Sequence, residues 1–154
     1  MKSEIVDAET WHCGQIARRL RAEHRSLLIG HDISVHRELR DAFDASMWRK
    51  AWFLDGRLMG IAGITGTVSS GEGNVWLAVS DEALGRPISL ARLVLRGLEE
   101  VMLVKRHLTT IVLKDDRAAV RFAYFLGFHV EMQTTINGAA AMIMAFDTLV
   151  RKVA

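Results

Sequence analysis

The chain has 154 residues and a mass of 17.2 kDa, half of its residues are hydrophobic, and its formal net charge is +2. Those values predict one domain with a sizeable core, and they exclude a disordered or fibrous chain and argue against a strong binder of nucleic acid. The single cysteine, Cys13, excludes an internal disulfide. The sequence has no run of 18 apolar residues, so no membrane span is predicted. Its N-terminal stretch does not predict a secretory signal.

The first half of the chain predicts a strand, two helices and an antiparallel hairpin. Ile16 and Leu20 mark the apolar side of the first helix, and Ser34 is the predicted N-cap of the second. A period of two and an Asp-Gly turn at 55–57 then indicate paired strands. These elements cover, in chain order, residues 3–8, 10–28, 34–43, 48–54 and 58–65.

The second half begins with a loop at 67–73, a strand at 74–80 and another loop at 81–89. A strongly amphipathic helix follows, and Pro87 suits its first turn, where a missing N–H has no cost. The core face of this helix is predicted to consist of apolar residues at i, i+3, i+4 and i+7 spacing, namely Ala91, Val94, Leu95, Leu98, Val101 and Met102.

Residues 107–113 form the next predicted strand, which completes a right-handed parallel strand–helix–strand unit. Asp115 or Asp116 then caps a helix that Gly127 ends as its C′ residue. The last two strands form a hairpin around Asn137-Gly138, the strongest short hairpin signal in the chain. This order of elements predicts a mixed sheet of the α/β (α+β) class with helices on its faces.

These elements resemble those of the GCN5-related N-acetyltransferase (GNAT) superfamily. The segment RAAVRFAYFLGFHVE (117–131) is similar to the superfamily's helix that ends in Gly-Phe before the last hairpin. Residues 16–28, 52–64 and 75–100 also resemble phage-encoded members, the group that includes podophage internal virion proteins. The resemblance spans residues 3–147 and implies a single domain over 1–154, with a mostly antiparallel sheet of about seven strands and about four helices.

The resemblance implies that acyl-CoA, here acetyl-CoA, lies where the fourth and fifth strands separate. Backbone groups of Leu77, Ala78, Val79 and Ser80 would bind the pantetheine arm, and a helix N-terminus would hold the pyrophosphate. The residues implied at that second position are Gly85, Arg86, Ile88, Ser89 and Leu90. Two departures from the superfamily's loop are Glu82, whose charge opposes a polyphosphate, and Pro87, which lacks an N–H donor. Arg86 is expected to compensate by binding a phosphate oxygen.

The catalytic residues are less well specified. Members of the superfamily commonly carry a general-acid tyrosine at the position of Ala123, whereas the only tyrosine here is Tyr124, about 100° further around the helix. Tyr124 is therefore the candidate general acid, and the alternative is that its ring packs on a neighbouring loop. Candidate bases on the acceptor side are Glu23, His24, His31, His36 and Glu72, and none is singled out by spacing.

Two hypotheses follow. The first is an N-acetyltransferase that uses acyl-CoA and an unidentified amine acceptor, in the cytoplasm of a bacterium or infected host. The second is a phage virion-associated or interaction protein that keeps the scaffold without catalysis, and a CoA-binding sensor lies between them. The histidines lack metal-ligand spacing, so no metal is expected. Neither nucleic acid nor a membrane is an expected partner, and the oligomeric state is not predicted.

Overall fold

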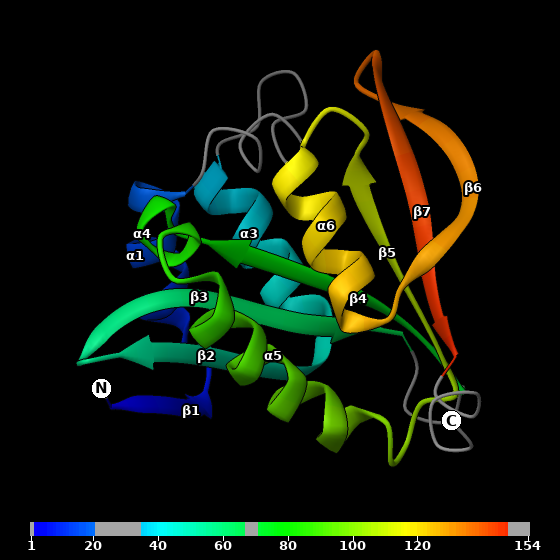
Figure 1. The fold of residues 1–154 in the computed structure, drawn as a ribbon. Helices are drawn as coiled ribbons and strands as arrows, with labels where there is room; N and C mark the ends of the chain where they lie inside the picture. Colours follow the sequence, from blue (N-terminus) through cyan, green and yellow to red (C-terminus); the bar gives the residue numbers. More distant parts are fainter. Residues whose placement is uncertain (1, 21–34, 67–70, 148–154) are drawn as a thin grey trace.

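In a computed structural model, residues 2–20, 35–66 and 71–147 are described, and they form seven strands and five helices (Figure 1). The helices are α1 (Thr10–Arg19), α3 (Val35–Ala45), α4 (Asp81–Leu84), α5 (Pro87–Val101) and α6 (Arg117–Leu126). The strands are β1 (Ser3–Asp7), β2 (Ser46–Leu54), β3 (Arg57–Thr65), β4 (Glu72–Val79), β5 (His107–Leu113), β6 (His129–Ile136) and β7 (Ala139–Asp147).

One sheet contains all seven strands, in the order β1-β2-β3-β4-β5-β7-β6. The β4–β5 pair is parallel and the other five pairs are antiparallel, which confirms the predicted mixed sheet. Both predicted hairpins are present. Their turns, Asp55-Gly56 and Asn137-Gly138, have positive φ at both residues, as a tight two-residue hairpin turn requires.

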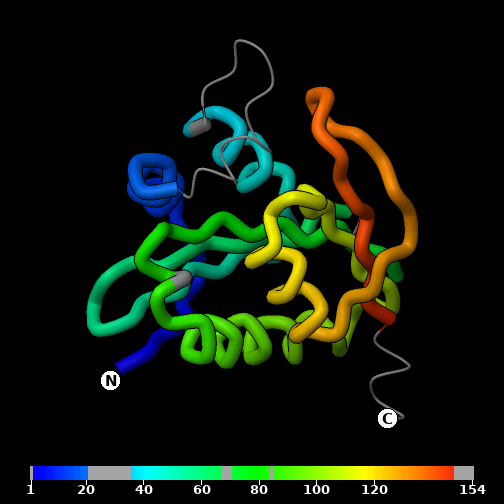
Figure 2. Tube along the Cα trace, turned by 45° about the horizontal axis from the view of Figure 1, so that its top comes forward, coloured from blue at the N-terminus to red at the C-terminus, as the bar shows by residue number. Residues whose placement is uncertain are grey.

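Helices cover both faces of the sheet. In Figure 1, α5 and α6 lie in front of the sheet and α1 and α3 lie behind it, and Figure 2 shows the sheet between α5 and the α1–α3 pair. The larger apolar cluster lies beneath α5 and α6 and includes Trp52, Leu98 and Phe146. The smaller cluster lies beneath α1 and α3 and includes Ile16 and Ile61.

The amphipathic helix packs as predicted. Five of the six residues expected on the core face of α5 are buried, and the sixth, Leu95, is half-buried against the core. At the start of α6, the Asp116 carboxylate accepts a 3.2 Å hydrogen bond from the Ala119 N–H, so Asp116 and not Asp115 is the cap. At its end, Gly127 is left-handed with φ of 106°, which confirms its predicted role.

The structure differs from the predicted elements at four places. The first helix ends at Arg19, because Leu20 is extended and forms an isolated bridge with Ser80. The predicted loop at 81–89 contains the short helix α4, whose first-turn carboxylates at Asp81 and Glu82 favour the positive end of the helix dipole. β2 and β4 each start two residues early. The predicted N-cap Ser34 lies outside the described residues.

Candidate functional site

The parallel strands β4 and β5 pair over only three residues. Glu72, Gly73 and Asn74 pair with His107, Leu108 and Thr109, and beyond that point β4 pairs with β3 while β5 pairs with β7. Figure 1 shows the two strands diverging from this junction, as the sequence resemblance implied. The separation leaves a gap in the sheet that only side chains and a bound molecule can fill.

A cavity of about 310 Å³ occupies this gap. Leu39 and Ala42 of α3 line it from one face of the sheet, whereas side chains of α5 and α6 line it from the other. The walls contributed by those two helices are Leu90, Val94, Leu98, Ala118, Ala119, Phe122, Ala123 and Leu126. The cavity therefore passes between the strands and brings both faces of the sheet to one place.

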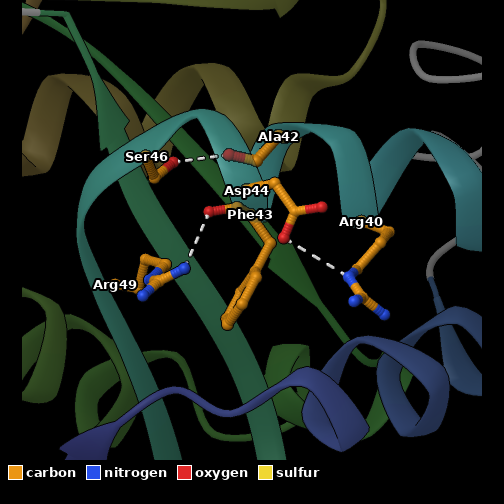
Figure 3. Close-up of polar contacts among 6 residues, drawn as sticks. All are labelled: Arg40, Ala42, Phe43, Asp44, Ser46 and Arg49. Atoms are coloured by element: carbon orange, nitrogen blue, oxygen red, sulfur yellow. Dashed lines mark hydrogen bonds and ion pairs between the residues drawn. The ribbon is translucent and has the colours of Figure 1, made fainter.

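The α3 side of the cavity wall is held by hydrogen bonds around Ser46, the first residue of β2. Its hydroxyl donates a 2.6 Å bond to the Ala42 carbonyl at the end of α3 (Figure 3). The same hydroxyl oxygen accepts a 2.7 Å bond from Nε1–H of Trp76 on β4, whose ring lines the cavity. Next to it, the Arg49 guanidinium lies 4.2 Å from the centre of the Phe43 ring. These contacts fix the orientation of Trp76.

Three of the four residues predicted to bind the pantetheine arm line the cavity. Leu77 is half-buried, and Ala78 and Val79 are buried. Ser80 does not line it: this residue follows the end of β4, is 1% exposed, and donates a 2.9 Å hydrogen bond from its N–H to the Met59 carbonyl. The Ser80 hydroxyl has no hydrogen-bond partner within the described part of the chain. A buried hydroxyl of this kind is suited to a ligand or water.

The predicted phosphate loop divides between two helices. Gly85 ends α4 in a right-handed conformation, Arg86 is the N-cap of α5, and Pro87 is its first residue. The first-turn amides of Ile88 and Ser89 have no acceptor within the helix, so they suit an anion. The Ile88 side chain is exposed, that of Ser89 is half-buried, and Leu90 is buried in the cavity wall.

Two ion pairs modify the charge of this loop. The Arg57 guanidinium, at the start of β3, lies 2.6 Å from a carboxylate oxygen of Glu82, the residue whose negative charge opposes a polyphosphate. Arg86 lies 3.9 Å from Asp55 in the β2–β3 turn. Arg57 therefore balances the unfavourable charge of Glu82. The sequence of the loop did not indicate this ion pair, because Arg57 lies 25 positions earlier in the chain.

On α6, the structure separates the two candidate positions for a general acid. Ala123 is buried and lines the cavity. Tyr124 is 52% exposed and is not among the residues that line the cavity. The proposed role of Tyr124 stays a prediction, and its ring lies on the outer side of the helix.

A second, polar pocket of about 490 Å³ adjoins the point where β4 and β5 separate. Asn74 lines both this pocket and the cavity, so the two spaces meet at that residue. His107 Nε2 lies 3.7 Å from a Glu131 carboxylate oxygen within the pocket. The lining comes from β3, β4, β5 and β6 and the turn after β3: Thr65, Gly66, Glu72, Gly73, Asn74, His107, Thr109 and Glu131.

The polar pocket distinguishes among the candidate bases. Glu72 lies in it, whereas the His36 imidazole lies beside Gly14 of α1 and lines neither space. Glu23, His24 and His31 lie outside the described residues. Sequence analysis missed Asn74, His107 and Glu131, because residues from three strands meet there only after the sheet forms.

Over residues 2–20, 35–66 and 71–147, no group of three or more His, Cys, Asp or Glu side chains is placed to hold a metal ion. None of the helices found in these ranges has the length and apolar character needed to cross a membrane.

Several solved structures that are similar to this chain are named as acetyltransferases. Putative acetyltransferase YncA of Salmonella typhimurium, solved with acetyl-CoA, is 17% identical with a TM-score of 0.72, over 96% of this chain and 95% of that one. Spermidine N-acetyltransferase of Vibrio cholerae, solved with CoA and spermine, is 15% identical with a TM-score of 0.73, over 96% of each chain. AAC(6')-Ib, solved with paromomycin and acetyl-CoA, is 14% identical with a TM-score of 0.70, over 100% of this chain and 99% of that one.

No family model and no curated protein matches the sequence. At these identities the comparisons establish that the chain has the GNAT fold, which confirms the fold that the sequence resemblance implied.

Proposed function

We propose that this protein is an acyl-CoA-dependent N-acyltransferase that transfers an acetyl group to an amine. The observation that carries the proposal is the cavity between β4 and β5, which side chains from both faces of the sheet line. Acyl transfer needs such a site, because donor and acceptor must meet in a defined orientation at one carbonyl carbon. Similar folds solved with acetyl-CoA, or with CoA and spermine, add support.

Acetyl-CoA is the proposed donor. Beyond Asn74, β4 pairs with no strand on the β5 side within the described residues, so the pantetheine arm is assigned to that edge of β4, along residues 77–80. The apolar cavity, which Leu77, Ala78 and Val79 line, suits the arm itself. The pyrophosphate is assigned to residues 85–90, where the amides of Ile88 and Ser89 favour an anion.

The acceptor is assigned to the polar pocket, where Glu72 and Glu131 favour a protonated amine. Glu72 is the proposed base, because it lies beside the junction at Asn74 where the pocket meets the cavity. The bound ammonium first loses a proton to Glu72, and the resulting neutral amine attacks the acyl carbon. The C–N bond forms as the C–S bond breaks. The second amine proton leaves to solvent, and the departing sulfur takes a proton from solvent or from Tyr124, the acid suggested by sequence.

Two measurements on the purified protein test this proposal. Calorimetric titration with acetyl-CoA should give saturable binding, and a thiol reagent should detect CoA release when spermidine, lysine or an aminoglycoside is added. The variant Glu72→Gln tests the proposed base. It should bind acetyl-CoA as the wild-type protein does and lose turnover. Absence of binding at millimolar acetyl-CoA would contradict the proposal.

The second candidate, a virion-associated or interaction protein without catalysis, is favoured by two residues in the site. Ala123 occupies the cavity wall where related enzymes commonly carry the acid, and Pro87 removes one amide from the phosphate loop. This candidate predicts no turnover with any amine and co-purification with phage particle proteins. Turnover with an amine would exclude this second candidate. For the enzyme, the proposed location is the cytoplasm.

A further inference from the structure

Asn74 lies where the two spaces of the candidate site meet. Among the described residues, it is the only one that lines both the cavity and the polar pocket. It is also the last residue of β4 that pairs with β5, through Thr109, before the two strands separate. The acyl group proposed to lie in the cavity and the amine proposed to enter by the polar pocket therefore come together beside Asn74.

The backbone of Asn74 is held on both edges of its strand. On one edge it pairs with Thr65 of β3, and the Thr65 hydroxyl donates a 3.4 Å hydrogen bond to the Asn74 carbonyl. On the other edge it pairs with Thr109 of β5. A side chain that starts from a strand paired on both edges has a fixed origin, which suits a group that must orient a reactant.

The Asn74 side chain lies on the face of the sheet that α1 and α3 cover. Successive side chains of a strand point to opposite faces. Trp76 and Ala78 pack with the apolar cluster beneath α1 and α3, whereas Val75 and Leu77 pack with the cluster beneath α5 and α6. The register between β3 and β4 is unbroken along this stretch, so Asn74 shares the face of Trp76 and Ala78.

Glu72, the proposed base, lies on the same face as Asn74. It is two positions earlier on β4, and the register with β5 is continuous from one residue to the other. The two Cα atoms are therefore roughly 7 Å apart along the strand. An amine that gives a proton to Glu72 is then within reach of the Asn74 side chain as well.

The side-chain amide of Asn74 is available to a ligand. The residue is exposed, and its side chain makes no hydrogen bond with the part of the chain that the structure describes. Its Oδ1 is an uncharged acceptor, which binds the N–H of an ammonium and of a neutral amine alike. Glu72 becomes neutral once it has taken the proton of the ammonium, whereas Asn74 remains the same acceptor throughout.

We propose that Asn74 is a catalytic residue, whose Oδ1 accepts a hydrogen bond from the acceptor amine and directs the nitrogen lone pair at the acyl carbon. That lone pair forms the C–N bond, and the electron pair of the C–S bond leaves with the sulfur. The hydrogen bond strengthens as the attacking nitrogen gains positive charge, and the remaining amine proton then leaves to solvent. This inference rests on the proposed acyltransferase function and adds the residue that orients its acceptor.

Steady-state kinetics of Asn74→Leu test the proposal, with whichever of spermidine, lysine or an aminoglycoside the wild-type protein acetylates fastest. Leucine keeps the approximate volume of the side chain and removes the acceptor atom. The value of kcat/KM for the amine should fall roughly 10- to 100-fold, whereas the Kd of acetyl-CoA should stay within about twofold. Asn74→Asp keeps an acceptor oxygen and should be at least about fivefold more active than Asn74→Leu.

Gln133→Leu is the matched control, because it removes an exposed side-chain amide of β6 that lines neither space. It should leave kcat/KM unchanged. If Asn74→Leu keeps kcat/KM within about threefold of wild type, this inference is wrong and the proposed function stands. Equal activity of Asn74→Asp and Asn74→Leu, or loss of acetyl-CoA binding in Asn74→Leu, would also overturn it. If the wild-type protein acetylates no amine, both the inference and the proposed function fail.

Discussion

Adding one methyl group at Gly63 should destabilise the protein through the network that holds Trp76. An ideal Cβ on Gly63 would lie 2.6 Å from Ser46 Oγ and 2.6 Å from Trp76 Nε1. Real Cβ atoms essentially never make contacts this short, so Gly63→Ala must move at least one of these groups. Moving either group breaks the 2.7 Å hydrogen bond between them.

The expected cost follows from three contributions. Overpacking a well-packed site costs about 1–3 kcal/mol. Loss of the Trp76–Ser46 hydrogen bond costs about 0.5–1.5 kcal/mol. Replacement of glycine restricts the unfolded chain and offsets about 0.4–1 kcal/mol of that cost. The free energy of unfolding of Gly63→Ala should therefore fall by about 2 kcal/mol.

Urea unfolding of Gly63→Ala and Gly71→Ala would measure this effect. Gly71 is the matched control, since the nearest atom to its ideal Cβ is 3.7 Å away. Because Trp76 lines the cavity, Gly63→Ala should also weaken acetyl-CoA binding. If the two variants differ by less than 0.5 kcal/mol, which is the usual range for surface substitutions, the packing described around Gly63 is incorrect.

Three further predictions concern the base, a buried histidine and a helix cap. Glu72→Gln should lower kcat/KM roughly 100-fold with little change in acetyl-CoA affinity. Tyr124→Phe should lower kcat/KM by a smaller factor, because the Tyr124 ring lies outside the cavity. A larger loss of kcat/KM in Tyr124→Phe than in Glu72→Gln would contradict these roles. Burial lowers the pKa of His12 below the usual 6.5, although the charge of Glu9 opposes the shift. The unfolded state therefore binds more protons than the folded state at acidic pH. The free energy of unfolding should fall as the pH drops below about 6.5. Urea midpoints that do not change between pH 7.5 and 5.5 would contradict this, and His12→Asn should flatten the profile. Asp116→Ala should lower the free energy of unfolding by about 1 kcal/mol through loss of the α6 cap, whereas Asp116→Asn should retain most of it, as thermal unfolding would show.

Much of the fold was predictable because its signals are local. The spacing of apolar residues from Ala91 to Met102 identified the buried face of α5, and Asn137-Gly138 identified the last hairpin. The errors lay where a distant contact overrides local preference. Leu20 leaves the helical pattern because it bridges Ser80, sixty positions later in the chain.

The candidate site was predictable only in part. The resemblance implied cofactor contacts at residues 77–80 and at Gly85, Arg86 and residues 88–90. Leu77, Ala78, Val79 and Leu90 line the cavity, and the binding roles stay predictions. Glu72 was one of five candidate bases that spacing did not separate. The structure places Glu72 beside Asn74 and His107, on two strands that pair over three positions, whereas Glu23, His24 and His31 lie outside the described residues. The role of Glu72 as the base stays a proposal.

The sequence by itself determined the order of the elements and the mixed sheet, because the turn signals and the spacing of apolar residues that predict them are local in the chain. Only the tertiary structure decided two features of the site: the length of the β4–β5 pairing and the Arg57 partner of Glu82. Each depends on groups that are far apart in sequence and meet only when the sheet and its helices pack. The near-neutral charge of the whole chain likewise leaves room for a local anion site at α5, because helix amides act at short range.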